Sequence, residues 1–149
     1  MIRTLAYITV GLLISASLGC TCLQQSDSST KTEAASAAMT LGMKEWSWIQ
    51  TIYNNDTTIT PAKAGIFTLT FNSDDTVHVS TDCNRMNGSY SVDGRKLNFS
   101  KLAATRMYCP DSQETEFAEM LAQVTSFLFT PRGELVLELK FDSGQILFK

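Results

Sequence analysis

Aromatic and β-branched side chains gather in short runs that begin at Trp46 and continue to the C-terminus. Both tryptophans and all eight phenylalanines lie in this part of the chain, and turn-forming Gly, Pro, Asn and Asp residues separate the runs. Phe67, Leu69 and Phe71 alternate with threonines, which predicts a strand with one buried face. The pattern predicts about eight or nine short strands, at residues 46–53, 66–71, 76–80, 89–92, 96–99, 102–107, 127–130, 135–141 and 146–148.

One segment has the period of a helix instead. Apolar side chains recur there at spacings of three and four, at Phe117, Met120, Leu121 and Val124. Asp111, three residues before Glu114, is typical of a capped helix start. We therefore expect one amphipathic helix at about residues 112–124. These elements predict a mainly β (α+β) fold, in which the helix packs on a small antiparallel barrel or a strongly curved sheet.

The N-terminal residues have a different pattern. Arg3 is the single charge among the first 19 residues, and an apolar-to-small run extends from Leu5 to Gly19. This pattern is typical of a secretory signal peptide. The alternative is a short transmembrane anchor, but the run is shorter than the roughly 20 residues that a membrane-spanning helix needs.

Ser17-Leu18-Gly19-Cys20 resembles the bacterial lipobox, in which the cysteine is acylated and the chain is cleaved just before it. We expect lipid attachment at Cys20, with Cys22 as the rival acceptor. The resemblance further implies that Thr21, as a residue other than Asp, favours the outer membrane. The predicted organisation is a lipoprotein signal peptide at 1–19, a disordered tether at 20–43 and a folded domain at 44–149.

Composition and charge exclude several classes of protein. Twelve Lys and Arg residues against 15 Asp and Glu give a net charge of −3, which lacks the basic field that nucleic-acid binding requires. A single histidine, His78, excludes a His-rich zinc site. We expect no metal, no cofactor and no nucleic-acid partner. The membrane, reached through the lipid anchor, and an unidentified envelope protein or ligand are the expected partners.

Two segments resemble the motifs of the META/HslJ domain family. The first is Thr81-Asp82-Cys83-Asn84-Arg85-Met86-Asn87-Gly88-Ser89-Tyr90, and the second is Ala104-Thr105-Arg106-Met107-Tyr108-Cys109-Pro110. The resemblance implies a lipocalin-like antiparallel β-barrel with one helix, in a secreted or lipid-anchored bacterial protein linked to envelope or stress responses. The family has no agreed enzymatic activity. Its motif residues here are Asp82, Cys83, Asn84, Gly88, Tyr90, Thr105, Arg106, Met107, Cys109 and Pro110.

The motif residues lead to specific expectations. In an oxidising compartment we expect a Cys83–Cys109 disulfide, worth roughly 3 to 4 kcal/mol, with two buried thiols as the alternative and Cys22 left over. Gly88 is expected where a side chain cannot fit or φ is positive. Asn84 is expected to bond its own loop backbone. Thr105 and Arg106 form either a polar site with Asp82 or Asn84, or a solvated face of the sheet.

These expectations lead to two hypotheses about function. The first is a non-enzymatic binding or structural lipoprotein of the cell envelope, with a variant in which the barrel interior or the helix-sheet cleft holds an apolar ligand. The second is a thiol or hydrolytic enzyme that uses Cys83, His78 or the pair of Asp82 and Arg106. A disulfide at Cys83 would remove the thiol that this second hypothesis needs.

Overall fold

The computed structural model describes residues 39–149. This part of the chain contains ten strands, one α-helix and two short 3-10 helices, η1 (Leu41–Met43) and η2 (Lys140–Asp142). The α-helix is α2 (Glu114–Leu121). The strands are β1 (Trp46–Tyr53), β2 (Thr58–Ile59), β3 (Thr68–Phe71), β4 (Thr76–Ser80), β5 (Arg85–Asp93), β6 (Lys96–Phe99), β7 (Ala103–Ala104), β8 (Val124–Phe129), β9 (Leu135–Leu139) and β10 (Gly144–Phe148).

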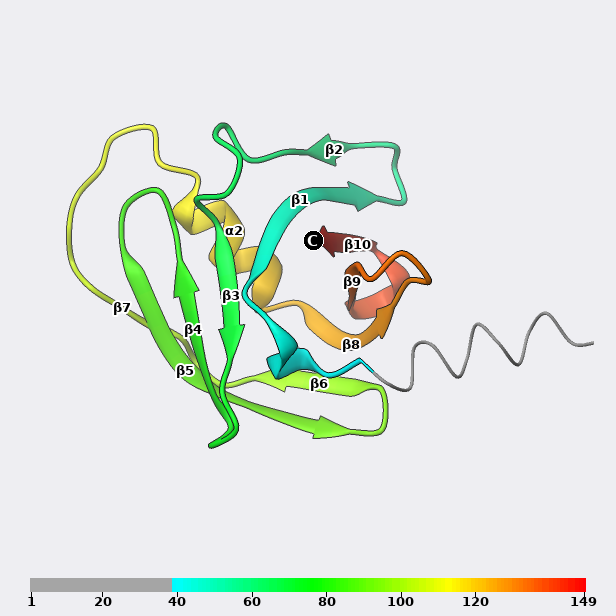
Figure 1. The fold of residues 1–149 in the computed structure, drawn as a ribbon. Coiled ribbons are helices and arrows are strands. Elements are labelled where there is room, and N and C mark those ends of the chain that lie inside the picture. Colours follow the sequence, from blue (N-terminus) through cyan, green and yellow to red (C-terminus); the bar gives the residue numbers. More distant parts are fainter. Residues whose placement is uncertain (1–38) are drawn as a thin grey trace, which may run out of the picture.

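Eight of these strands close into an antiparallel barrel. Hydrogen-bonded neighbours follow the order β10-β9-β8-β6-β5-β4-β3-β1, and β1 pairs in turn with β10 to complete the ring (Figure 1). The two shortest strands lie outside it, since β2 pairs with β1 and β7 pairs with β5. The predicted mainly β fold with one helix is confirmed, and the sheet is a closed barrel.

The barrel interior is filled by side chains. Phe67, Leu69 and Phe71 all point inward, as their alternation predicts, and are at most 3% exposed. Phe117 of α2 lies with its ring centroid 5.0 Å from that of Trp48 and 5.1 Å from that of Phe67. The helix therefore inserts its apolar stripe into the core. Aromatic side chains therefore lie in the space in which one variant placed a ligand.

Two predicted elements are much shorter than expected. The strand predicted at 102–107 is limited to β7, because the last backbone bond to β5 is from the N–H of Thr105 to the carbonyl of Arg85, and the N–H of Met107 bonds to the side chain of Asn84 instead. The helix begins at Glu114, and its N-cap position is Gln113. Asp111 is not the cap, since its backbone has φ 63° and lies outside the helix. Val124, placed at the end of the helix by its spacing, is the first residue of β8.

Two neighbouring strands of the barrel, β6 and β8, are joined by few backbone hydrogen bonds. Strands β6 and β8 share a single paired position, Lys96 with Ser126, supported by a bond from the N–H of Phe127 to the carbonyl of Arg95 at 2.9 Å. The remainder of β6, from Leu97 onward, has no paired position on β8. Helix α2 lies in the chain immediately before β8.

The packing at the N-terminal side begins at Leu41. This side chain is 7% exposed, and its carbonyl accepts a bond from Nε1 of Trp46 at 2.6 Å. The core therefore includes residues ahead of the boundary predicted at 44.

The expected signal peptide, Cys20 and Cys22 lie outside the described residues. Within 39–149, none of the helices has the length and apolar character needed to cross a membrane.

Candidate functional site

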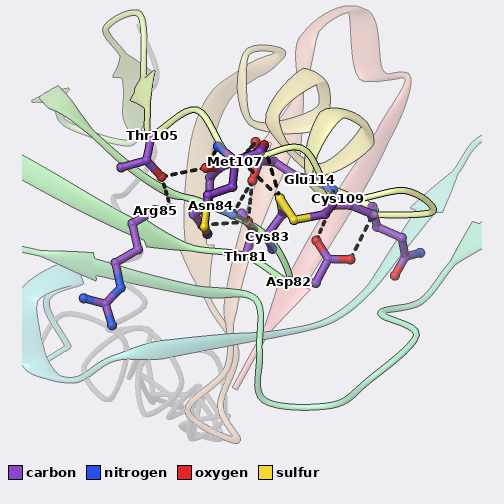
Figure 2. Close-up of a disulfide and its surroundings, with 11 residues drawn as sticks. Thr81, Asp82, Cys83, Asn84, Arg85, Thr105, Met107, Cys109 and Glu114 are labelled. Atoms are coloured by element: carbon purple, nitrogen blue, oxygen red, sulfur yellow. Dashed lines mark hydrogen bonds between the residues drawn. A yellow bond between two sulfur atoms is a disulfide. The ribbon is translucent and has the colours of Figure 1, made fainter.

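A disulfide joins the two motif segments. Cys83 is bonded to Cys109, with their Cα atoms 5.8 Å apart, inside the range that disulfides require (Figure 2). Cys83 lies in the turn between β4 and β5, whereas Cys109 lies in the long connection between β7 and α2. The predicted bridge is confirmed, and the alternative of two buried thiols is wrong. The bond fixes a connection that contains no regular secondary structure between Ala104 and Glu114.

Asn84 is the centre of the hydrogen bonds around this bridge. Its side chain is 5% exposed, and its Oδ1 accepts bonds from the hydroxyl of Thr105 at 2.6 Å and the N–H of Met107 at 2.9 Å. Its Nδ2 donates to the carbonyl of Met107 at 3.1 Å and to Oε1 of Glu114 at 3.0 Å. An amide suits this position because it both accepts and donates. The side chain of Asn84 therefore bonds the second motif and Glu114 rather than the backbone of its own loop, which corrects the prediction.

Glu114 links the helix to the first motif. Its Oε2 accepts the backbone N–H of Asn84 at 2.6 Å. The hydroxyl of Thr81 lies 2.7 Å from this same oxygen and 2.7 Å from the carbonyl of Asn84, so its one proton serves one of the two. The carboxylate stands in the first turn of α2, where the helix dipole favours negative charge. The sequence placed Glu114 near the N-terminus of the expected helix but did not indicate that it reaches Asn84.

Asp82 caps the helix from across the chain. Its Oδ2 accepts the N–H of Gln113 at 2.9 Å, and its Oδ1 accepts the hydroxyl of Ser112. The side chain of Gln113 then spans to the segment after β2, where it accepts from the N–H of Ala62 at 2.7 Å and donates to the carbonyl of Thr60 at 3.2 Å. The first motif therefore supplies the carboxylate that Asp111 was predicted to supply.

Two further motif residues lie along β5. A Cβ added to Gly88 would come 2.8 Å from Cδ2 of Leu102 and 3.0 Å from Oγ of Ser100, so a side chain at this position would require these two side chains to shift. Tyr90 packs edge-on against Phe71 with centroids 5.0 Å apart, and its hydroxyl donates to the carbonyl of Asn72 at 3.0 Å. Burial raises the pKa of Tyr90, and the nearby charges of Asp75 and Asp74 raise it further.

The remaining motif residues face solvent. Thr105 bonds to Asn84, so the expected polar site holds for this residue. Arg106 is exposed and has no hydrogen bond or ion pair within residues 39–149, so the expected solvated position holds for it. Pro110 is exposed, and the side chain of Met107 is 61% exposed even though its backbone is bonded on both sides to Asn84.

The arrangement does not bring together the groups that the enzymatic hypothesis names. The sulfur of Cys83 is bonded to Cys109 and offers no thiolate. His78 is exposed on β4, and its ring contacts the side chain of Asn87 on β5. Among the residues that the structure describes, no group of three or more His, Cys, Asp and Glu side chains is placed to hold a metal ion.

A groove of about 540 Å³ lies between α2 and the chain that links β6 to β7. Its apolar lining comes from Met86, Phe99, Leu102, Ala104, Ala118 and Ala122. Lys101 and Glu119 lie at opposite sides, on the connection between β6 and β7 and on the helix respectively. The helix-sheet cleft expected for a ligand therefore exists as a cavity.

The domain is a closed eight-stranded antiparallel barrel with one helix packed into its core. A disulfide joins its two motif segments. The chain belongs to the META domain family, which matches it over residues 31–148. The resemblance read from the two motifs is thereby confirmed.

Solved structures share the fold. An NMR structure of a protein from Burkholderia xenovorans has a TM-score of 0.60 and 24% identity, covering 73% of this chain and 82% of that one. A crystal structure of a DUF4847 family protein from Bacteroides vulgatus has a TM-score of 0.57 and 18% identity, covering 72% of this chain and 92% of that one. At these identities the likeness concerns the fold alone. Comparison with curated proteins finds no match.

Proposed function

We propose that this META-family protein is a lipid-anchored component of the bacterial cell envelope whose barrel acts as a non-enzymatic binding module. The Cys83–Cys109 disulfide is the observation that supports this proposal most strongly, because disulfides form and persist in oxidising compartments outside the cytosol. The apolar leader and the lipobox-like Ser17 to Cys20 provide a route to such a compartment and an anchor within it.

In this proposal the lipid anchor holds the protein on the membrane, and the barrel binds the ligand or partner. Two or three acyl chains hold a protein on a bilayer, since each buried CH₂ contributes about 0.8 kcal/mol. Thr21 after the acylated cysteine favours the outer membrane, with the barrel facing the periplasm. The solvent-facing groove beside α2 gives this barrel a surface of suitable size for a ligand or partner. A part in envelope stress follows from the family resemblance and belongs to the same proposal.

Metabolic labelling with an alkyne analogue of palmitate tests the anchor. The full chain is expressed in a Gram-negative host, beside the Cys20→Ala variant and the matched Cys22→Ala variant. We expect label on the unmodified chain and on Cys22→Ala, and none on Cys20→Ala. Label that disappears only with Cys22→Ala, or that is absent from all three proteins, would overturn the anchor at Cys20.

Growth of a deletion strain tests the envelope role. Loss of the protein should sensitise cells to detergent or outer-membrane damage, and the full chain should restore growth. The Cys20→Ala chain should fail to restore it although it accumulates to the same level. Full rescue by that variant would show that the anchor is dispensable for the role.

A further inference from the structure

The outer edge of β7 has backbone groups that are available for pairing. Strand β7 pairs with β5 through Ala104 with Met86 and Ala103 with Asn87, and the N–H of Thr105 donates to the carbonyl of Arg85 at 3.1 Å. Because successive residues of an antiparallel strand alternate in the direction of their peptide groups, the N–H and carbonyl of Ala104 face away from β5. No strand of the described part of the chain lies on that side.

The opposite wall of the same groove is helix α2. Thr115, Ala118, Glu119 and Ala122 line it, on one face of the helix. The space between this face and β7 is the 540 Å³ groove, whose apolar floor includes Met86, Phe99 and Leu102. A groove with a strand edge on one side and a helix on the other fits an extended peptide, which pairs through its backbone and buries alternate side chains. An acyl chain would leave the edge groups of β7 unpaired.

Charge selects the kind of peptide. Glu114 and Glu119 both line the helix side of the groove, against Lys101 on the other side. Glu114 is already bonded to Asn84, whereas Glu119 is exposed and has no ion pair within residues 39–149. A basic side chain of a bound peptide would find its partner at Glu119.

We infer that the groove between β7 and α2 binds an extended segment of a partner protein, which adds as a strand to β7 and alternates apolar residues with basic ones. This inference deepens the proposed binding role and does not depend on the lipid anchor. The peptide's apolar side chains would lie on Met86, Phe99 and Leu102, and its basic side chains would face Glu119.

Amide NMR titration of the soluble chain tests the inference. The barrel and its core are complete within residues 39–149, so the chain without its leader, carrying Cys20→Ser and Cys22→Ser, is suitable. The probe is a seven-residue peptide that alternates lysine and valine, and the matched control peptide alternates glutamate and valine. Laurate, a single acyl chain, is the third probe. We expect the lysine peptide alone to shift the amides of residues 99–104 and 115–122.

Two variants separate strand addition from other binding. Ala104→Pro removes a donor that makes no bond within the barrel, so the fold should persist while peptide affinity falls at least about tenfold. Glu119→Lys should lower the affinity of the lysine peptide about two- to fivefold and raise that of the glutamate peptide.

Four results would overturn the inference. The first is equal binding of both peptides, and the second is lysine-peptide binding that Ala104→Pro leaves unchanged. The third is a groove that responds to laurate and to neither peptide, which would assign the cavity to an acyl chain. The fourth is a titration in which no probe shifts the groove amides; with normal labelling of Cys20, this result would remove the peptide site and leave the anchor standing.

Discussion

The carboxylate of Glu114 accepts two hydrogen bonds from Asn84, one from its backbone N–H at 2.6 Å and one from its Nδ2 at 3.0 Å. These residues are 30 positions apart in the chain. The pair connects the start of α2 to the first motif, and Asn84 connects the same point to the backbone of Met107. The two motifs and the helix are therefore one structural unit.

Glu114→Ala is expected to destabilise the domain by about 1 to 3 kcal/mol, because it removes the charged acceptor of two hydrogen bonds from the buried Asn84. The Asn84 N–H then keeps only the hydroxyl of Thr81, and its Nδ2 keeps the carbonyl of Met107. Glu114→Gln keeps one oxygen and should cost less. Urea unfolding followed by tryptophan fluorescence measures both. Glu119→Ala, on the same helix but exposed, should change the stability by no more than about 0.5 kcal/mol. Equal effects of Glu114→Ala and Glu119→Ala would contradict the role given to Glu114.

Removal of the disulfide should lower the free energy of unfolding by about 3 to 4 kcal/mol in the chain-entropy model. The double variant Cys83→Ser with Cys109→Ser and the chemically reduced protein should show the same loss, because both release the connection between β7 and α2. Parallel urea titrations make the comparison. A double variant as stable as the oxidised protein would show that the bonds of Asn84 hold this connection without the bridge.

Gly144→Ala is expected to cost more stability than Gly88→Ala. A Cβ at Gly144 would lie 2.5 Å from the carbonyl oxygen of Ile52 and 2.9 Å from the Cα of Tyr53, which are backbone atoms of the paired strand β1. At Gly88 the nearest atom is the end of the Leu102 side chain, which can rotate away. We expect about 1 to 3 kcal/mol for Gly88→Ala and a larger loss for Gly144→Ala. Thermal unfolding of the two variants ranks them, and the reverse order would refute the packing described here.

The raised pKa of Tyr90 predicts a loss of stability in alkali. Folding raises this pKa above the ordinary value of 10.0, mainly by burial, so the folded state holds the phenol proton more tightly. The resulting stabilisation is complete below pH 10.0 and disappears as the pH rises through the folded value. Tyr90→Phe should therefore flatten the dependence of stability on pH above that point. Indistinguishable pH profiles for the two proteins would be inconsistent with this account.

The core followed from the sequence because burial in a strand has a period of two. The alternation from Phe67 to Phe71 and the helical stripe at Phe117, Met120 and Leu121 were sufficient to identify buried faces. The Cys83–Cys109 bridge followed from the family motifs and the redox compartment.

The hydrogen bonds that join Asn84, Glu114 and the second motif could not be predicted from the sequence in the same way. Glu114 and Asn84 are 30 residues apart and meet through the tertiary fold, and a polar residue carries no periodic signal that identifies a distant partner. Asp82 replaced Asp111 as the cap for the same reason, since local spacing favoured the nearer carboxylate. The strand predicted at 102–107 ended early because the backbone of Met107 bonds to the side chain of Asn84 rather than to a strand.

Site-specific photocrosslinking in living cells tests most directly the proposal that this protein binds a partner through the β7 and α2 groove. A benzophenone amino acid replaces Ala122, which lines the groove, or Val92, which is exposed in the β5 to β6 hairpin away from it. The account predicts a discrete crosslinked protein from position 122, lost when Glu119→Lys is added, and none from position 92. Equal crosslinking from both positions, or a product that Glu119→Lys leaves unchanged, would contradict it.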